Sequence, residues 1–170
     1  MSKISKEAGL LLAVSDFKKS KAFYEIVMKQ KIIQEDVNMV YYESGVALQG
    51  DYAEIVAGEK DFAPRPSGAK IEIKQKSNSC QVGFEVEDLD YWVEKIKATE
   101  GIELLHDVTE YNWGQRVIRF YDYDGHIIEL GEDLQVVAKR LQAQGLTEEQ
   151  IAGKMNFLPL EFLQQLLNAE

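Results

Sequence analysis

The sequence contains little cysteine, histidine and proline: one, two and three residues respectively in a chain of 170. Cys80 therefore has no partner for an internal disulfide, and no Cys/His cluster has the spacing of a zinc site, so we expect a reducing compartment. Free cysteines are usually small buried residues. We therefore interpret Cys80 as a small residue of a strand rather than as a nucleophile.

The chain also lacks a long apolar run and an excess of basic residues. No stretch reaches the roughly 18 consecutive apolar residues that a membrane span needs, and the apolar run before Asp16 is too short for a secretory signal. The net charge of −10 disfavours nucleic acid, because phosphate binding needs a basic face. We expect a cytoplasmic protein with no nucleic-acid or membrane partner. An apolar content of 45% is sufficient for one or two small domains.

What the sequence does contain is an internal repeat. Residues 9–28, "GLLLAVSDFKKSKAFYEIVM", read as a strand followed by Asp16 as the N-cap of an amphipathic helix. Residues 81–98, "QVGFEVEDLDYWVEKIKA", have the same pattern with Asp88 as the cap. The repeats also end alike, since "YYESGVALQ" aligns with "YDYDGHIIE". Each unit is therefore predicted to contain a strand, a helix and three strands.

The segments outside the repeats have different patterns. "DYAEIVAG", residues 51–58, fits either a short helix or a continued strand, and "EKDFAPRPSGAK", residues 59–70, reads as a surface connection. After Glu132 the pattern becomes helical, with Gly145 ending one helix, Thr147 and Gln150 in capping-box spacing, and Pro159 at the start of a third. We expect units at about 8–58 and 79–132 within a domain of residues 1–132, and a helical extension over 133–170.

Two tandem βαβββ units, the second closing with "DYDGHIIE", resemble the vicinal oxygen chelate superfamily, which includes glyoxalase I, bleomycin-resistance proteins and extradiol dioxygenases. The resemblance covers residues 8 to about 132. It implies an α+β fold in which the two units form one eight-stranded curled mixed sheet, an open cup with the helices outside and a small-molecule site inside. The side chains facing the cup have the opposite parity to the apolar core residues.

The resemblance also implies where a metal would bind. Metal-dependent members take two ligands from each unit, and the corresponding positions here are Gly9, Gln49, Gln81 and Glu129. Gly9 cannot ligate, and two amides with one carboxylate bind hard divalent ions weakly. We therefore expect a degenerate site and no cofactor, with a divalent metal on Gln49, Gln81 and Glu129 as the alternative.

The alternating run after Trp113 places further polar side chains in the cup. If Ile118 and Phe120 pack under the helices, then Gln115, Arg119 and Tyr121 face the ligand site. An arginine inside a concave surface needs a counter-charge, and Glu129 on the neighbouring strand is its natural partner. Arg119 could instead bind a carboxylate or phosphate group of a ligand.

The two histidines differ in their prospects. His106 precedes a loop that carries Trp113 near the mouth of the cup, so it is a candidate proton shuttle or ligand contact as well as a structural residue. His126 has the parity of Ile128, which points it away from the cup. The catalytic candidates are therefore Glu129 and His106, and the ligand-binding candidates are Gln49, Gln81, His106, Trp113, Gln115, Arg119, Tyr121 and Glu129.

Three classes of function fit these features. The first is a metal-free protein that binds a small molecule, as drug-resistance members of the superfamily do. The second is a metal-dependent lyase, isomerase or dioxygenase of glyoxalase type. The third is an interaction module acting through the helical tail, which superficially resembles helix-turn-helix proteins. Lys154 is the only cation between Glu148 and Glu170, so packing against the cup or a second subunit, giving a homodimer, is preferred to DNA binding.

Overall fold

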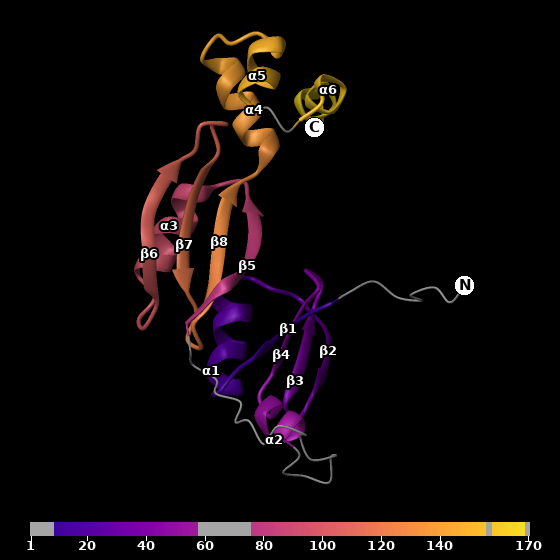
Figure 1. Cartoon of the computed structure of the whole chain (residues 1–170), viewed down its shortest axis with the longest axis vertical. Helices are drawn as coiled ribbons and strands as arrows, with labels where there is room; N and C mark the ends of the chain where they lie inside the picture. The colour runs from indigo at the N-terminus through magenta and orange to yellow at the C-terminus, as the bar shows by residue number, and fades with distance from the viewer. Residues whose placement is uncertain (1–8, 58–75, 156–157, 169–170) are drawn as a thin grey trace, which may run out of the picture. The chain divides into compact units, whose positions relative to one another are not determined.

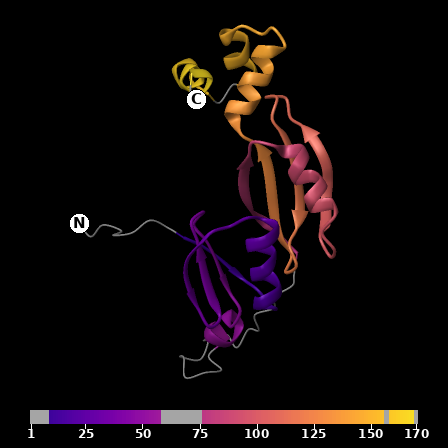
Figure 2. The same ribbon diagram turned by 180° about the vertical axis from the view of Figure 1, so that it is seen from behind.

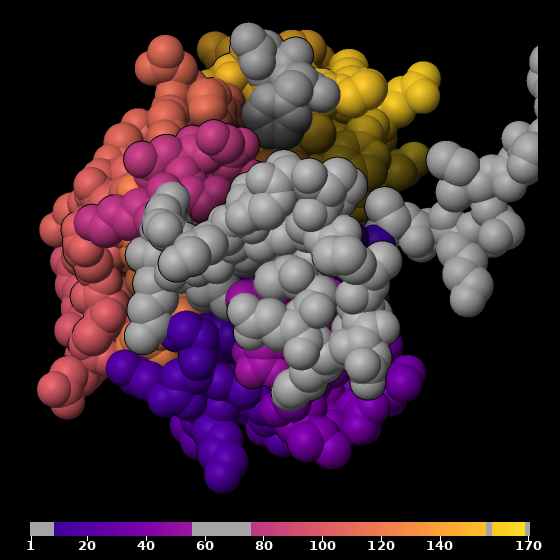
Figure 3. All heavy atoms as spheres, turned by 60° about the horizontal axis from the view of Figure 1, so that its bottom comes forward, coloured from indigo at the N-terminus to yellow at the C-terminus, as the bar shows by residue number. Residues whose placement is uncertain are grey.

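The structure is a computed structural model that describes residues 9–57, 76–155 and 158–168, and the other residues are grey in Figures 1 and 3. The chain divides into two compact units. The first comprises Met1–Ser77 with Asp122–His126, and the second comprises Asn78–Tyr121 with Ile127–Glu170. The surface connection expected at residues 59–70 lies outside the described residues.

The first unit contains a four-stranded mixed sheet in the order β1-β4-β3-β2. β1 pairs in parallel with β4, and the other two pairings are antiparallel. The segment after β4 is helical, which settles the choice between helix and strand (Figure 1). The elements are β1 (Leu10–Ala13), α1 (Phe17–Ala22), η1 (Phe23–Val27), β2 (Ile32–Asp36), β3 (Met39–Tyr42), β4 (Val46–Gln49) and α2 (Tyr52–Ala57).

The second unit repeats this arrangement with the strand order β5-β8-β7-β6. Its elements are β5 (Ser77–Val86), α3 (Leu89–Lys97), β6 (Glu103–Glu110), β7 (Arg116–Tyr121) and β8 (His126–Glu132). The α+β class and the tandem βαβββ units are thus confirmed. Hydrogen bonds join the eight strands as two four-stranded sheets, one from each repeat.

The predicted caps and apolar faces explain why the helices lie where they do. Asp16 accepts from the backbone N–H of Lys19, and Asp88 accepts from that of Tyr91, so both N-caps are confirmed. α3 buries Leu89, Val93 and Ile96, a helical spacing that forms one apolar stripe. Figure 2 shows α3 lying along one face of the second unit's sheet, so this helix leaves the opposite face of that sheet uncovered.

The first helix contains a feature that its sequence pattern does not reveal. α1 continues directly into the π-helix η1, in which the N–H of Met28 bonds to the carbonyl of Phe23 at 3.0 Å. The consecutive residues Phe23 and Tyr24 of this turn are both buried, at 2% and 0% exposure. An ordinary α-helical turn would separate two adjacent side chains by about 100°.

The turn between β7 and β8, Asp122–His126, packs against α1 and belongs to the first unit. Asp124 accepts from the backbone N–H of Ser15 and from the hydroxyl of Ser20, each at 2.9 Å. Asp122 accepts from the hydroxyl of Tyr24 at 2.9 Å and from Nδ1 of His126 at 2.8 Å. The two aspartates of the Asp-Tyr-Asp-Gly turn are therefore buried anchors, with several donors around each.

His126 should make the stability of the protein depend on pH near neutrality. Burial alone would lower the pKa of His126, but the hydrogen bond and the charge of Asp122 outweigh it and raise that pKa. The stabilisation is therefore fully present below the ordinary histidine value of about 6.5 and is lost as the pH rises through the folded-state pKa. We expect the loss in unfolding free energy caused by His126→Asn to shrink between slightly acidic and alkaline pH, measured by urea denaturation.

Tyr24→Phe is the matched control for this prediction. It removes another hydrogen bond to the same Asp122 carboxylate without removing a group that titrates near neutrality. Its cost should stay constant over the same pH range. A pH-independent cost of His126→Asn would contradict the charged pair.

The chain beyond Asp133 forms three helices with a core of their own. These are α4 (Leu134–Ala143), α5 (Glu148–Lys154) and α6 (Leu160–Asn168). Thr147 and Gln150 form the predicted capping box, and Gly145 follows the end of α4 with a φ of 90°. We call residues 133–170 the appendix, and their separation from residues 1–132 as a domain stays a prediction. The buried side chains of its core are Val137, Ala138, Leu141, Ile151, Met155 and Leu163.

A buried carboxylate connects the β5–β8 sheet to α4. Glu132, at the end of β8, is 1% exposed. Its Oε1 accepts from Nε of Arg116 at 2.9 Å, and its Oε2 accepts from the backbone N–H of Arg116 and from Nη2 of Arg140. Burial would raise the pKa of Glu132, but the hydrogen bonds from Arg116 and Arg140 lower it. The carboxylate is therefore held ionised between two guanidinium groups.

Candidate functional site

One row of polar side chains crosses the face of the second unit's sheet that α3 does not cover. Arg119 on β7 lies opposite Glu129 on β8, and their side chains form the expected ion pair. Nε of Arg119 donates to Oε1 of Gln81 at 3.0 Å, and Nε2 of Gln81 donates to Oε2 of Glu129 at 3.3 Å. Nη1 of Arg119 contacts Nε2 of His106 at 3.1 Å and the hydroxyl of Tyr111 at 2.5 Å. We call these five residues the polar row.

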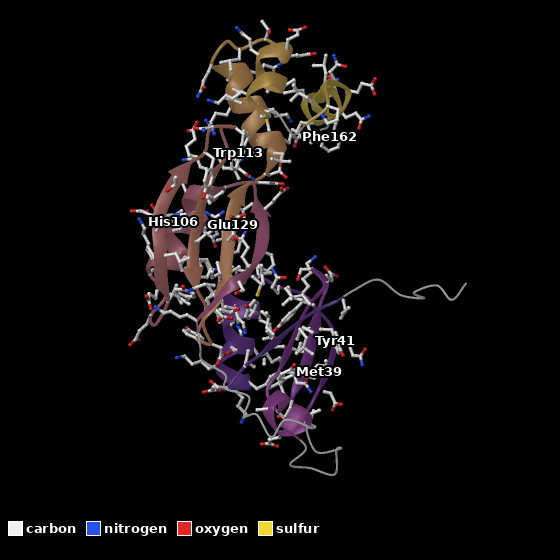
Figure 4. All side chains as sticks on the ribbon, viewed as in Figure 1. Met39, Tyr41, His106, Trp113, Glu129 and Phe162 are labelled. Carbon is white, nitrogen blue, oxygen red and sulfur yellow. The ribbon has the colours of Figure 1, made fainter. Side chains whose placement is uncertain are left out.

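His106 joins the row because β6 is irregular. Leu104 lies opposite Phe120, yet His106 lies opposite Arg119, so the register shifts by one residue between them. A shift of this kind turns the following side chain to the other face of the sheet. In an unbroken strand His106 would have kept the parity of Leu104. Figure 4 shows His106 and Glu129 on β6 and β8 of this sheet.

The partners of His106 fix its tautomer. A guanidinium group can only donate, so Nε2 of His106 accepts from Arg119. Nδ1 then carries the hydrogen and donates to the carbonyl oxygen of Asp107 at 2.7 Å. In this arrangement both ring nitrogens of His106 are engaged in hydrogen bonds. His106 therefore helps to orient Arg119 and does not act as a free base in this arrangement.

Glu129 retains one oxygen directed to the surface of the sheet. Oε2 is the atom that contacts Arg119 and Gln81. Oε1 faces Gly83 on β5, where an added Cβ would lie 3.8 Å from it. Oε1 therefore lies beside a residue without a side chain, on the side of the carboxylate away from the Arg119 contact. The row thus offers an acceptor beside a fixed cation.

The tip of the β6–β7 hairpin adds an aromatic wall to one end of the row. We call residues Tyr111–Gly114 the hairpin tip. The rings of Tyr111 and Trp113 stack with centroids 4.5 Å apart, and the guanidinium carbon of Arg119 lies 5.5 Å from the centroid of Tyr111. Nε1 of Trp113 donates to Gln115, whose own Nε2 donates to the carbonyl of Glu132. Gln115 therefore supports the wall rather than extending the row.

The remaining candidates occupy other places. The hydroxyl of Tyr121 donates to the side-chain oxygen of Asn78. Gln49 ends β4 in the first unit and donates to Asp51 at 3.2 Å. It lines a hollow of about 260 Å³, one wall of which is Met39, labelled with Tyr41 on β3 in Figure 4. The structure brings Gln81, His106, Arg119 and Glu129 together, and Gln49 belongs to a different unit.

The donor set does not fit a divalent metal. Among the described residues there is no group of three or more His, Cys, Asp or Glu side chains that could hold an ion. Gly9 offers no side-chain donor atom, and the one carboxylate of the row already pairs with Arg119. A guanidinium therefore occupies the position at which Glu129, Gln81 and His106 converge. A metal at that position would be repelled by Arg119 and would have only Glu129 as a charged ligand.

Comparison with known proteins identifies the fold. The family model for the glyoxalase-like domain matches residues 8–135, which is most of the chain. The chain belongs to the glyoxalase-like family. This places it in the vicinal oxygen chelate superfamily, as the repeats and the closing turn predicted. A comparison with curated protein sequences gives no match.

Several solved structures share the fold. A protein of unknown function from Agrobacterium tumefaciens is 27% identical, with a TM-score of 0.61 over 78% of this chain and 97% of that one. The fosfomycin resistance protein FosX from Listeria monocytogenes, complexed with Mn(II) and sulfate, is 22% identical, with a TM-score of 0.55 over 82% and 99%. Lactoylglutathione lyase from Agrobacterium tumefaciens is 21% identical, with a TM-score of 0.55 over 78% and 96%.

Sequence reasoning missed two residues of this site. Tyr111 was not a candidate, because a tyrosine in a turn gives no periodic signal, yet its hydroxyl contacts Arg119. Gly83 was not a candidate either, and a Cβ added there would lie 3.8 Å from Oε1 of Glu129. A glycine inside a strand is a recognised sign of close approach by another group, and that signal could have found Gly83.

None of the helices in the described part of the chain has the length and apolar character needed to span a bilayer.

Proposed function

We propose that this glyoxalase-like chain binds a small organic molecule at the polar row, with Arg119 as a fixed cation in place of a divalent metal. The observation that carries the proposal is the ion pair of Arg119 with Glu129, together with the contacts of the same guanidinium to Gln81, His106 and Tyr111. The cation of this site is therefore part of the chain. A cytoplasmic location and a homodimer stay predictions.

The row suits a ligand that both donates and accepts hydrogen bonds. A donor of the ligand would bind Oε1 of Glu129 above Gly83, and an apolar or aromatic part would lie against Trp113. The guanidinium is held by Gln81, His106 and Tyr111, so little conformational entropy is lost when a ligand binds. Because the lone pair of His106 is engaged, the proposal assigns binding and no catalytic step to the row.

The alternative function is a metal-dependent lyase, isomerase or dioxygenase. What favours it is the shared fold of FosX, which was crystallised with Mn(II). It is disfavoured while Arg119 stays paired with Glu129, because a metal ion bound to the same carboxylate would lie close to the guanidinium charge and be repelled by it. The two functions therefore differ in how metal content should depend on Arg119.

Metal content provides the test. Protein purified without added metal should contain far less than stoichiometric zinc, nickel, iron or manganese after dialysis, measured by inductively coupled plasma mass spectrometry. Arg119→Ala should gain affinity for Ni²⁺ in calorimetric titration, because it frees Glu129, His106 and Gln81 as donors. The control is the Arg119→Ala/Glu129→Ala double variant, which lacks the carboxylate and should not gain it. Stoichiometric metal in the unaltered protein would favour the enzyme.

A further inference from the structure

The appendix contacts the polar row's aromatic wall through the hairpin tip. Nη2 of Arg140, on α4, donates to the carbonyl oxygen of Gly114 at 2.5 Å. Gly114 has a φ of 90°, and a Cβ added there would lie 3.1 Å from Cε of Lys154 and 3.3 Å from Cδ1 of Leu141. The tip is thus held by one hydrogen bond and by close packing against α4 and α5 (Figure 4, beside the Trp113 label).

The side chain of Arg140 is held in place by Glu132 and by the packing of α4. The same Nη2 donates to Oε2 of the buried Glu132 at 2.9 Å. The adjacent residue, Leu141, is 2% exposed in the core of the appendix, among Ile151 and Met155. A guanidinium fixed at Glu132 and anchored on a packed helix presents its N–H groups in one direction. The carbonyl of Gly114 therefore meets a donor whose position is set by the appendix.

The hairpin tip carries this constraint to the site. The N–H of Gly114 bonds to the carbonyl of Tyr111 at 2.8 Å, so the tip is a closed turn. At the start of that turn, Tyr111 stacks on Trp113 and its hydroxyl accepts from Nη1 of Arg119. A continuous set of contacts therefore leads from Arg140 through Gly114 and Tyr111 to Arg119.

We propose that the appendix positions the aromatic wall of the site and that Arg140 is the positioning residue. This inference rests on the proposed function, because it takes the polar row to be a ligand-binding site. The contacts themselves do not depend on any ligand. The family match ends at residue 135, so the helices that hold the hairpin tip are an addition to the glyoxalase-like domain. Their role is to hold Tyr111 against the guanidinium of Arg119. This contact in turn sets the geometry of the polar row.

The experiment measures Arg119 and Trp113 directly in the full chain. Trp92→Phe leaves Trp113 as the sole tryptophan of the two in the sequence. In that background, Arg140→Met should shift the Trp113 emission to longer wavelength and remove its protection from acrylamide quenching. It should also move the Arg119 Nε–Hε cross-peak in a ¹H–¹⁵N NMR spectrum, assigned by Arg119→Lys. Arg140→Lys, which keeps a donor, should restore part of both signals.

Two further variants make the result decisive. Lys139→Met removes the neighbouring exposed cation of the same helix and should leave both signals unchanged. Gly114→Ala strains a positive φ and places a methyl group 3.3 Å from Cδ1 of the buried Leu141, while Arg140 and Glu132 remain, so it should move both signals even if Arg140→Met fails to fold. Unchanged signals in Arg140→Met and Gly114→Ala, or equal changes in Lys139→Met, would overturn the positioning role. Metal binding by the unaltered protein would overturn only the proposed function.

Discussion

Glu132→Ala should lower the free energy of unfolding by about 3 kcal/mol, as expected when one partner of a buried ion pair is removed and the other charges stay. The carboxylate is 1% exposed and lies between two guanidinium groups, those of Arg116 and Arg140. Without it these cations repel each other at the junction of β8 and α4. Chemical denaturation monitored by circular dichroism measures the loss.

Glu110→Ala is the matched control for this loss. Glu110 also faces Arg140, at 3.8 Å, but its side chain is 45% exposed, so its removal should cost less than about 1 kcal/mol. The pH dependence gives a second check. Because the pKa of Glu132 is lowered, its contribution is present above the ordinary glutamate value and is lost as the pH falls through the folded-state pKa. The difference in unfolding free energy between the unaltered protein and Glu132→Gln should therefore become smaller in acid. Equal losses of unfolding free energy in Glu132→Ala and Glu110→Ala would contradict the role of the buried pair.

The second large effect concerns the ion pair of the polar row. Arg119→Ala and Glu129→Ala should each cost about 2 kcal/mol, less than for a fully buried pair because the two side chains are 21% and 19% exposed. The double variant should cost less than the sum of the two single variants by about 1 kcal/mol. The reason is that each single variant leaves a partly buried charge without its counter-charge. Unfolding free energies of the four proteins complete the cycle.

Arg116 and Asp90 provide a control cycle in the same unit. Their side chains lie 3.1 Å apart, but Asp90 is 75% exposed, so solvent screens the pair and the coupling should be close to zero. If the Arg119–Glu129 cycle were also additive, the pair would contribute no coupling, and Glu129 would be available for another role.

The local signals in the sequence predicted a large part of this structure. Asp16, Asp88 and Thr147 were recognisable caps, since a side-chain acceptor before an amphipathic run satisfies the free N–H groups of a helix. Strand parity placed Arg119 opposite Glu129, because alternation along adjacent strands leaves few choices of partner. The repeat then supplied the fold class through its resemblance to the vicinal oxygen chelate superfamily.

The features that escaped prediction depend on contacts between distant residues. The irregular register of β6 turns His106 toward Arg119, and nothing in "IELLHDVTE" marks where the shift occurs. Glu132 marked only the end of the second repeat in the sequence, because its buried ion pair depends on Arg140, a residue of the following helix. The same holds for Asp122 and Asp124, which read as turn residues and are anchors for α1.

The docking of the β7–β8 turn on α1 sets the order in which a growing chain can complete its parts. The hydrogen bonds from Ser15, Ser20 and Tyr24 to Asp124 and Asp122 span 98 to 109 residues. At about 5–20 residues per second, a ribosome needs roughly 5–20 s after making α1 to supply these partners. Until then the hydroxyl of Tyr24 lacks the acceptor that it has in the folded protein. The amino-terminal unit, although made first, is therefore finished only when most of the second repeat has been synthesised.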